Sequence, residues 1–382
     1  MEEWKTYILS DVCRFINGRA YSQDELLPQG KYQVLRVGNV GNDGHEWYYS
    51  DMELPNDKYC NYGDLLYTWA CNFGPVIWTG KKAIYHYHIW KVEENPEIID
   101  RHFLFYLLLC STESFKQSTN GSVMIHITKK DMERQEVRVP SLEIQKQIAS
   151  ILDSLYNKIE LNNRINHNLI KLAQELFNNK IAENACRSSG WRSASLLDIA
   201  EYLNGLAMQK YPAINGEFSL PVLKIKELGQ QACDANSDRC TETIPEQYIV
   251  KDGDIIFSWS GTLLLDFWCG GKCGLNQHLF KVSSDMYPDW FVYFWTKHHL
   301  DRFIRIAKDK AVTMGHIKRG DLGKAEVVIP EDAVMKKLDG EIAPLISECI
   351  ERRIENRKLQ GLRNSLLPKL MSGELKINDL TC

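Results

Sequence analysis

The apolar positions between residues 141 and 184 follow a heptad period, which is typical of a long helix packed against another helix. The apolar seam positions are Ile148, Leu155, Leu169 and Leu176 at one heptad position and Leu152, Ile159 and Ala173 at the other. Asn162 and Asn166 interrupt the seam, and polar residues at such places fix the register of a helix pair at a cost in stability. At about 1.5 Å per residue, roughly 35 helical residues would reach about 50 Å.

A second helix of the same kind is predicted near the end of the chain. It begins near Leu338 and continues through the apolar positions Ile342, Leu345, Cys349, Leu359 and Leu366. Pro368 is expected to stop it, because proline lacks the amide hydrogen that a helix interior needs. Two half-apolar helices need a surface to bury against, and the economical solution is an antiparallel pair. The alternative is that each helix packs only on its own globular domain.

The regions before the two helices are mixed in character. Residues 33–40 and 220–228 are predicted as strands, and so are "GDLLYTW" (63–69) and "GDIIFSW" (253–259), each after a Gly-Asp turn. Residues 100–117 and 288–307 have the period of amphipathic helices. "EVRVP" and "EVVIP" close each region with a short strand. The predicted class is therefore α+β.

The chain contains an internal duplication. "VMIHITKKDMERQEVRVP" (123–140) returns as "TMGHIKRGDLGKAEVVIP" (313–330), "WKTYILSDVCRFING" (4–18) as "WRSASLLDIAEYLNG" (191–205), and "HIWKV" (88–92) as "HLFKV" (278–282). The spacing between copies stays near 190 residues, which indicates one ancestral unit used twice. We expect two pseudo-symmetric mixed α/β domains (1–140 and 185–330), joined by two long antiparallel coiled-coil helices in the spacers 141–184 and 331–382.

Composition narrows the class of protein. The 382 residues include 44% hydrophobic and 25% charged residues, which can fill two domains of ordinary size. "MEEWKTYILSD" lacks the pattern of a signal peptide, and the longest apolar run (103–110) is too short to span a bilayer, so a cytoplasmic protein is expected. The 11 scattered cysteines are interpreted as reduced, buried thiols. "CGGKC" (269–273) with His278 fits no usual zinc spacing, and no metal site is predicted.

The helical segments closely resemble those of the specificity (S) subunits of type I restriction–modification systems. The resemblance rests on "VPSLEIQKQIASILDSLYNKIELNNRINHNLIKLAQELF" (139–177) and "LRNSLLPKLMSGEL" (362–375), with looser similarity at "GSVMIHITKKDM" and "GDIIFSWSGT". It covers nearly the whole chain. The second helical region opens with "IPEDAVMKKLDGEIAPL" and lacks the Gln-rich beginning of the first, so the two partner-docking faces are not expected to be identical.

The resemblance implies a non-catalytic subunit that reads a bipartite, asymmetric DNA target with its two domains. The helix pair would set the distance between the half-sites. Two modification (methyltransferase) subunits would dock on the helices and supply S-adenosylmethionine and adenine methylation. Restriction subunits would add ATP- and magnesium-dependent translocation and cleavage. The net charge of −4 is unusual for a protein that binds DNA alone, so partners would share the contacts to phosphate.

The residues themselves predict no catalytic site. The chain contains no Pro-Pro pair, which excludes the Asn/Asp-Pro-Pro-aromatic motif of adenine methyltransferases, and no Gly-x-Gly-x-x-Gly. "GPVIWTGKK" (74–82) departs from a phosphate-binding loop in spacing and lacks the Ser or Thr that would bind magnesium.

Base edges in the major groove are best addressed by Arg, Lys, Asn, Gln and small hydroxyl side chains. The corresponding loops of the two copies offer the candidates Trp69, Asn72, Lys81, Lys82, Lys116, Asn120, Ser122, Ser258, Ser260, Thr262, Lys272, Asn276, Gln277, Lys308 and Lys310. The repeated His126 and His316 fit either a DNA contact or a packed residue at a helix entry. Phe103, Phe105, Tyr106, Phe291, Tyr293 and Phe294 are predicted to be core.

Two other hypotheses remain open at this point. A helical scaffold whose duplicated domains bind protein and not DNA would suit the near-neutral charge. A self-contained modification enzyme is disfavoured by the missing cofactor and catalytic motifs.

Overall fold

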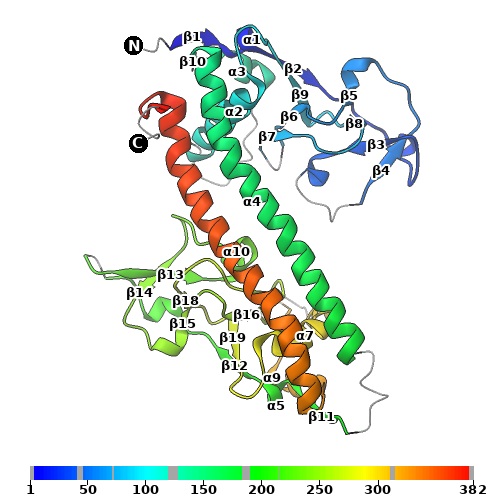
Figure 1. Cartoon of the computed structure of the whole chain (residues 1–382), viewed down its shortest axis with the longest axis vertical. Helices are drawn as coiled ribbons and strands as arrows, with labels where there is room; N and C mark the ends of the chain where they lie inside the picture. The colour runs from blue at the N-terminus through cyan, green and yellow to red at the C-terminus, as the bar shows by residue number, and fades with distance from the viewer. Residues whose placement is uncertain are drawn as a thin grey trace. The chain divides into compact units, whose positions relative to one another are not determined.

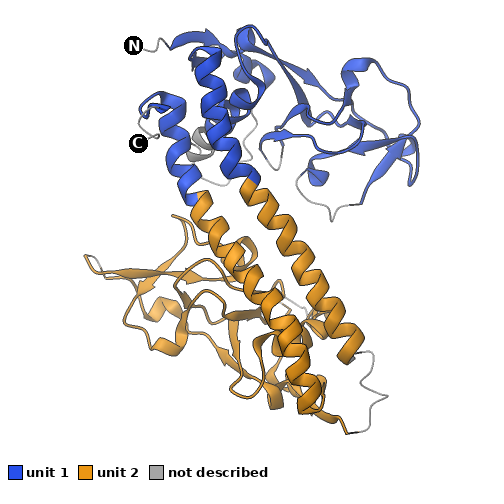
Figure 2. Ribbon diagram, viewed as in Figure 1, with its two compact units in different colours: residues 1–157, 361–382 blue, residues 158–360 orange. Residues whose placement is uncertain are grey.

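A computed structural model describes residues 4–40, 46–70, 73–118, 128–182, 190–214, 216–309 and 315–377. The chain forms two compact units, one of residues 1–157 and 361–382 and the other of residues 158–360 (Figure 2). Each unit contains one mixed domain and part of both long helices, so the division falls inside the helices and not at their ends. Unit 1 and unit 2 are described separately below.

Unit 1 contains two four-stranded sheets and a two-stranded one (Figure 1). The first sheet is antiparallel, in the order β2 (Cys13–Asn17), β9 (Ile89–Glu94), β6 (Leu65–Thr68) and β7 (Gly74–Ile77). The second has the order β4 (Tyr48–Ser50), β3 (Tyr32–Leu35), β8 (Ala83–Tyr85) and β5 (Tyr59–Cys60), with β3 and β8 parallel. The strands β1 (Lys5–Ile8) and β10 (Glu136–Val139) form the third.

Unit 2 repeats this topology strand for strand. Its antiparallel sheet has the order β12 (Glu201–Asn204), β19 (Leu279–Ser283), β16 (Ile255–Ser258) and β17 (Leu265–Phe267). Its second sheet has the order β14 (Arg239–Thr241), β13 (Ser219–Leu223), β18 (Cys273–Leu275) and β15 (Ile249–Val250). The strands β11 (Arg192–Ser195) and β20 (Glu326–Ile329) pair as β1 and β10 do. The predicted α+β class and its duplication are confirmed.

Short helices complete each unit. In unit 1 they are α1 (Leu9–Val12), α2 (Arg101–Ser118) and α3 (Lys129–Glu133). In unit 2 they are α5 (Leu196–Ile199), α6 (Ile225–Gln230), α7 (Asp289–His298), α8 (Leu300–Asp309) and α9 (Arg319–Gly323). The six aromatic residues predicted as core are all buried.

Several local predictions are wrong. The strand predicted over 33–40 continues only to Leu35, and a short 3-10 helix follows at Val37–Asn39. The single helix predicted over 288–307 is divided into α7 and α8 at His299, whose Nε2 lies 2.8 Å from the carbonyl oxygen of Glu326. This contact ties the junction between α7 and α8 to β20. The strand predicted over 220–228 continues only to Leu223, after which α6 begins at Ile225. Its alternating apolar residues suit both elements, because short apolar runs do not distinguish strand from helix.

The long helices are α4 (Leu142–Phe177) and α10 (Asp332–Ser372). The second begins before the predicted Leu338 and continues past Pro368. The prediction that Pro368 ends the helix is wrong because Leu367, Leu370 and Met371 pack into the core of unit 1, and their burial offsets one lost backbone hydrogen bond.

Within each unit the two long helices lie antiparallel, and both also pack on the globular domain. In unit 1, Leu152 near the start of α4 shares a core cluster with Leu370 near the end of α10. In unit 2, Phe177 at the end of α4 shares a cluster with Ile342 near the start of α10. The Phe177 ring also stacks on Phe294 of α7, with 5.4 Å between centroids. Helix pairing and packing on the domain, which the sequence left as alternatives, therefore occur together.

Candidate nucleic-acid interface

The turn that follows β6 carries Trp69, the first of the predicted DNA-contact residues. Its backbone N–H donates to the carbonyl oxygen of His88 at 3.2 Å and its indole N–H to that of Tyr87 at 3.0 Å. The ring stacks on Trp90 of β9 with 5.9 Å between centroids. Trp69 is half-buried, so its main effect is to hold the neighbouring turn at residues 86–88 in place.

That neighbouring turn, between β8 and β9, presents an aromatic and imidazole cluster that sequence reasoning missed. Ring centroids of His86, Tyr87 and His88 lie 4.0–4.8 Å apart, and Tyr87 is 40% exposed. Burial, followed by the nearby His88 and Arg36, lowers the pKa of His86 to about 4. His86 is therefore neutral at physiological pH and can accept as well as donate a hydrogen bond. The available signal was the alternation in "YHYHIW".

Unit 2 builds the same turn around Trp259. Its backbone N–H donates to the carbonyl oxygen of His278 at 3.3 Å, as in the first copy. Its indole N–H donates to Asn204 Oδ1 at 2.9 Å. Ser260 Oγ lies 2.9 Å from His278 Nδ1, which orients the imidazole ring.

The repeated His316 lies against this turn in unit 2. Residues Ser260 and His316 form an antiparallel bridge, and the Ile317 N–H donates to the carbonyl oxygen of Trp259 at 3.0 Å. The His316 ring meets Trp259 edge-on at 6.5 Å. The segment immediately before α9 thus holds the Trp259 turn in place through these contacts. His126, the counterpart in unit 1, lies outside the described residues.

The predicted residues of this end of unit 2 divide into supporting and exposed groups. Ser258 is fully buried, and its hydroxyl donates to the carbonyl oxygen of Thr262 at 2.6 Å while accepting from the Leu264 N–H at 2.6 Å. Ser260 and Asn276 are also buried, at 3% and 4% exposure. These three side chains are buried and support the loops from inside the domain.

The exposed members are Thr262, Lys308 and, in part, Gln277. Thr262 and Lys308 line one shallow groove of about 380 Å³, together with Gly315. The structure therefore brings together two predicted residues, one from the β16–β17 loop and one from α8, beside the segment that precedes His316.

The predicted lysines at the other turns lie at the opposite ends of the strands. Lys81 and Lys82 lie in the turn before β8. This turn is attached to the start of β6, because the backbone N–H of Trp78 donates to the Asp64 carbonyl oxygen at 2.9 Å. Lys272 occupies the equivalent turn of unit 2, before β18. All three are exposed, and Lys82 lies over the Tyr59 ring at 4.1 Å. The residue types were suited to DNA, but the spatial grouping was not visible in the sequence.

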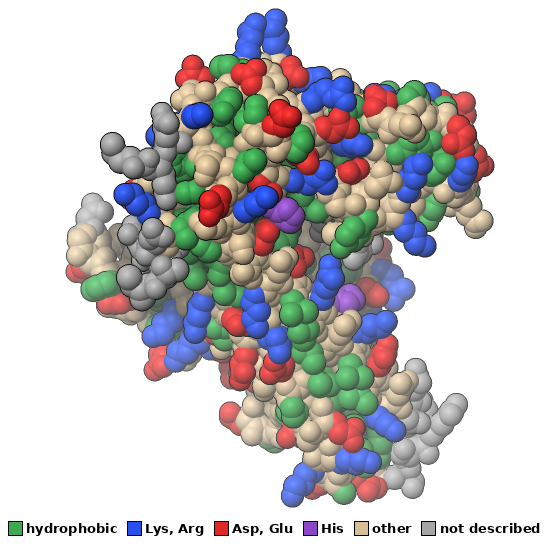
Figure 3. All heavy atoms as spheres, turned by 45° about the horizontal axis from the view of Figure 1, so that its top comes forward, with side chains coloured by type: hydrophobic (Ala, Val, Ile, Leu, Met, Phe, Trp, Pro, Cys, Tyr) green, Lys and Arg blue, Asp and Glu red, His purple; other side chains and the backbone are tan. Residues whose placement is uncertain are grey.

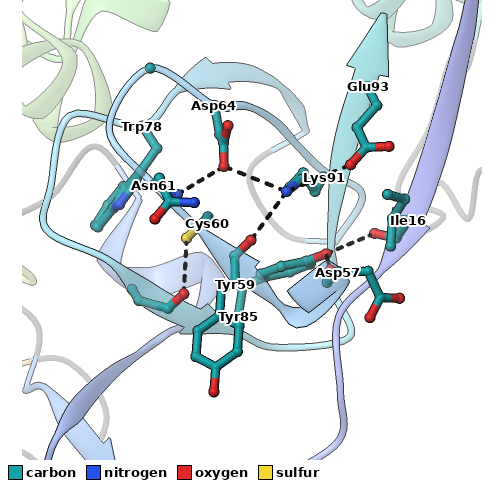
Figure 4. A network of polar contacts seen from close by, with 12 residues as sticks. Ile16, Asp57, Tyr59, Cys60, Asn61, Asp64, Trp78, Tyr85, Lys91 and Glu93 are labelled. Atoms are coloured by element: carbon teal, nitrogen blue, oxygen red, sulfur yellow. Dashed lines mark hydrogen bonds and ion pairs between the residues drawn. The ribbon is translucent and has the colours of Figure 1, made fainter. Parts of the chain in front are cut away.

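Figure 4 shows the polar network at this opposite end of unit 1. Lys91 Nζ lies 3.7 Å from Asp64 Oδ2 and donates to the Tyr59 carbonyl oxygen at 3.3 Å. In unit 2, Lys281 Nζ lies 2.8 Å from Asp254 Oδ2. In each copy the Asp of the repeated Gly-Asp and the Lys of the repeated His-x-x-Lys thus form an ion pair with a structural role. The Trp69 and Trp259 turns are not part of this ion pair.

The remaining candidates cannot be placed. Asn72, Asn120, Ser122 and Lys310 lie outside the described residues, and Lys116 falls on α2 in a part whose side chains are not described.

Charges of both signs are interspersed with hydrophobic side chains on the face drawn in Figure 3. This mixture agrees with the net charge of −4. Within the described part of the chain, no helix is long and apolar enough to cross a membrane. The same residues contain no group of three His, Cys, Asp or Glu side chains arranged to hold a metal.

The predicted helix seam is partly buried and partly displaced. Ile148, Leu152, Ile159 and Ile342 are buried. Leu155, Leu169, Leu176, Leu345, Leu359 and Leu366 are only half-buried. In unit 2 the buried seam of α4 keeps the predicted positions Asn162, Asn166 and Ala173. It then passes from Leu176 to Phe177, because a straight helix repeats every 3.6 residues and drifts from a strict heptad.

A polar layer closes the seam in unit 2. The side-chain NH₂ of Asn162 donates to Asn356 Oδ1 at 2.8 Å and to Glu355 Oε2 at 2.7 Å. Asn162 Oδ1 accepts from Arg352 at 3.0 Å, and Asn356 donates to Asn163 Oδ1 at 2.8 Å. The layer specifies one register for this part of the pair, since any slip would bury these amides without partners.

Two copies of one sheet topology, each continued by a long helix, define a protein with duplicated mixed α/β domains. Residues 1–171 match the family described as the type I restriction modification DNA specificity domain. The MjaVIII specificity subunit of Methanocaldococcus jannaschii is 28% identical, and the alignment covers 99% of this chain and 94% of that protein. The MjaIX specificity subunit of the same organism is 26% identical over 73% of this chain and 70% of its own length.

A solved structure shows the same fold. The type I S subunit from M. genitalium superposes with a TM-score of 0.59 at 15% identity, covering 97% of this chain and 96% of that one. The resemblance to type I specificity subunits therefore extends over nearly the whole chain, and the match to the family described above covers residues 1–171.

Proposed function

We propose that this chain is the non-catalytic DNA-recognition subunit of a type I restriction–modification complex and reads a bipartite target, with one domain for each half-site. The observation that carries the proposal is the turn in which the backbone N–H of Trp69 donates to His88 and that of Trp259 donates to His278. This turn occurs in both units on the same sheet topology, but with different neighbouring side chains. A common frame with different exposed groups suits a protein that reads two unlike half-sites.

We assign the DNA-facing surface to the end of each domain that carries the Trp69 or Trp259 turn. There, Tyr87 in unit 1 and Thr262 and Lys308 in unit 2 are exposed on rigid supports. Such side chains can contact bases and phosphates.

The outer face of α4 supports docking of a modification subunit. Leu161, Ile165, Leu169 and Leu172 follow one another at helical spacing, and Leu161 and Leu172 are 53% and 47% exposed. None of the four contributes to a hydrophobic cluster of the described residues. An exposed apolar stripe on a helix suits burial against helices of a partner.

In this proposal the chemistry resides in the partners, which would bind S-adenosylmethionine, ATP and magnesium. Modification would act on an adenine flipped from the duplex. A cytoplasmic location belongs to the same proposal.

The decisive experiment maps methylated adenines after co-expression of this chain with its candidate modification subunit in a methylation-free host. A single bipartite motif with a fixed gap is the expected result. Methylation without a shared motif, or a stable complex that methylates nothing, would refute the specificity role. That result would favour the protein-binding scaffold, which the charge of −4 and the apolar stripe also suit.

Matched variants test the two surfaces. Lys308→Gln should weaken binding of the assembled complex to its target and reduce the slope of log K against log salt by about 1. Lys272→Gln, an equally exposed lysine at the opposite end of the strands, should change neither. If Lys272→Gln has the larger effect, the assigned end is wrong.

Leu161→Gln combined with Leu172→Gln should reduce co-purification with the modification subunit. Met286→Gln, at a position that is 72% exposed outside the helices, should not. Equal co-purification of all these variants would exclude this face of α4 as the docking surface.

A further inference from the structure

Unit 2 contains a polar cavity that the proposed function does not use. Its volume is about 800 Å³, within the range of about 300–1,000 Å³ that is usual for small-molecule sites. Its walls are one face of α4 (163–175), the segment 353–360 of α10, the residues that end α6, and Lys297 of α7. All these walls belong to unit 2.

The cavity is positively charged. Lys171 and Lys297 line it, and neither forms an ion pair with any carboxylate of the described residues. Lys297 is half-buried over the Tyr293 ring, with 5.6 Å from Nζ to the ring centroid, and burial lowers its pKa. An anion beside Lys297 would offset the cost of keeping this ammonium charged.

Two guanidinium groups extend the positive wall and are held rigidly. Arg353 donates to Asp266 Oδ1 at 2.8 Å, and Arg357 pairs with Asp252 at 2.7 Å. Each carboxylate neutralises one guanidinium. Of the other charged side chains on the walls, Lys171 and Lys297 are cationic and Glu175 is anionic, so the lining keeps a net positive charge.

Carboxamides are the commonest side chains on the walls. Asn166 is 7% exposed, and its Oδ1 has no hydrogen-bond partner among the described residues. The side chains of Gln230 and Gln360 are exposed and make no hydrogen bonds to other described residues. Carboxamides offer a donor and an acceptor side by side, which is the pairing that an adenine edge requires. Ile170 and Ala232 add apolar surface for a ring face.

We propose that this cavity binds a purine nucleotide, with its phosphate beside Lys297 and Lys171 and its base against Asn166 and the neighbouring carboxamides. The walls carry basic side chains together with carboxamides and apolar groups, and this combination suits a ligand with an anionic end and a flat polar ring. This site does not depend on the DNA-recognition role.

The test is isothermal titration of the full-length chain with adenosine 5′-monophosphate, adenosine and inorganic phosphate. Adenosine 5′-monophosphate should bind with 1:1 stoichiometry, and adenosine and phosphate should each bind at least tenfold more weakly. Loss of a charge-assisted hydrogen bond corresponds to roughly tenfold or more in affinity, so Lys297→Met should weaken the nucleotide by that factor and leave adenosine nearly unchanged.

Asn166→Leu should weaken nucleotide and adenosine alike, because it removes the amide and keeps a similar volume. Lys171→Met provides a second charge variant on an exposed helix face, where misfolding is not expected. Lys324→Met, at an exposed position away from the cavity, is the control and should bind like the wild type.

Absence of binding by the wild-type chain, or binding that neither Lys297→Met nor Asn166→Leu alters, would overturn the proposal. Phosphate binding as tight as that of the nucleotide would overturn the assignment of a purine. Adenine methylation mapped in the complex is a separate readout, so the two proposals can fail independently.

Discussion

Asn162 and Asn356 are buried in the helix pair of unit 2, at 0% and 6% exposure, and replacing one of them should cost more than replacing both. Asn162→Leu removes three hydrogen bonds, to Asn356, Glu355 and Arg352. Glu355 keeps Lys158 at 3.4 Å and Arg352 keeps Glu348 at 2.6 Å, so these two remain paired.

The buried Asn356 Oδ1 is left without a donor. An orphaned buried acceptor costs about 1–3 kcal/mol, and the other lost bonds add about 1 kcal/mol. Burial of the new Leu side chain returns about 1–2 kcal/mol. The net destabilisation expected for Asn162→Leu is therefore about 2 kcal/mol.

The double variant Asn162→Leu with Asn356→Leu removes the orphan as well as its donor. Asn163, the other partner of Asn356, is exposed and can bond to water. Local stability should return to about the wild-type value, so the second replacement should offset nearly all of the cost of the first, and the two positions are strongly coupled. The helix pair would then have lost the polar layer that sets its register.

Native-state hydrogen exchange suits this prediction because a chain with two units need not unfold in one step. The amides of residues 158–166 and 352–360 should lose protection in the single variant and regain it in the double variant. Unchanged protection in the single variant, or two losses that simply add in the double variant, would refute the reasoning.

Three further predictions concern the domains. The pKa of His86 is about 4 in the folded chain, below its ordinary value of 6.5, so the unfolded state binds more protons between these pH values and stability falls as pH drops from about 6.5 toward 4. Since the ring is half-buried, the loss should be about 1–2 kcal/mol, and His86→Gln should flatten the change in melting temperature between pH 7 and 5. Gly18→Ala would place a Cβ 2.3 Å from the His86 carbonyl oxygen and should destabilise unit 1 by about 2–4 kcal/mol. In the same thermal assay Gly340→Ala should stabilise the chain by about 0.5–1 kcal/mol, because its Cβ lies inside α10 and meets nothing within 4 Å. Arg353→Met leaves the partly buried Asp266 without its ion-pair partner and should lower the free energy of unfolding by about 1–3 kcal/mol. Adding Asp266→Asn to the same chain should largely restore this stability. If it does not, packing and not charge dominates at this position.

The site was only partly predictable. The loops after β6 and β16 were chosen correctly as corresponding positions, but the His86–Tyr87–His88 cluster was missed because aromatic residues beside a strand usually indicate core. Ser258 was chosen for its hydroxyl, yet that hydroxyl is consumed within its own turn. Lys81, Lys82 and Lys272 were grouped with the Trp69 and Trp259 turns, although the strands separate them. Residue type does not reveal at which end of a strand a loop lies relative to another loop.

The sequence by itself determined the duplication, the α+β class and the two long helices, because repeats and hydrophobic periods are properties of local order along the chain. Only the tertiary structure decided that α10 continues past Pro368, that Asn162 meets Asn356, and that His316 pins the Trp259 turn. Each of these outcomes depends on groups far apart in sequence whose contacts offset a local preference. The cavity beside Lys297 belongs to the same class, since its walls come from five segments that only folding brings together.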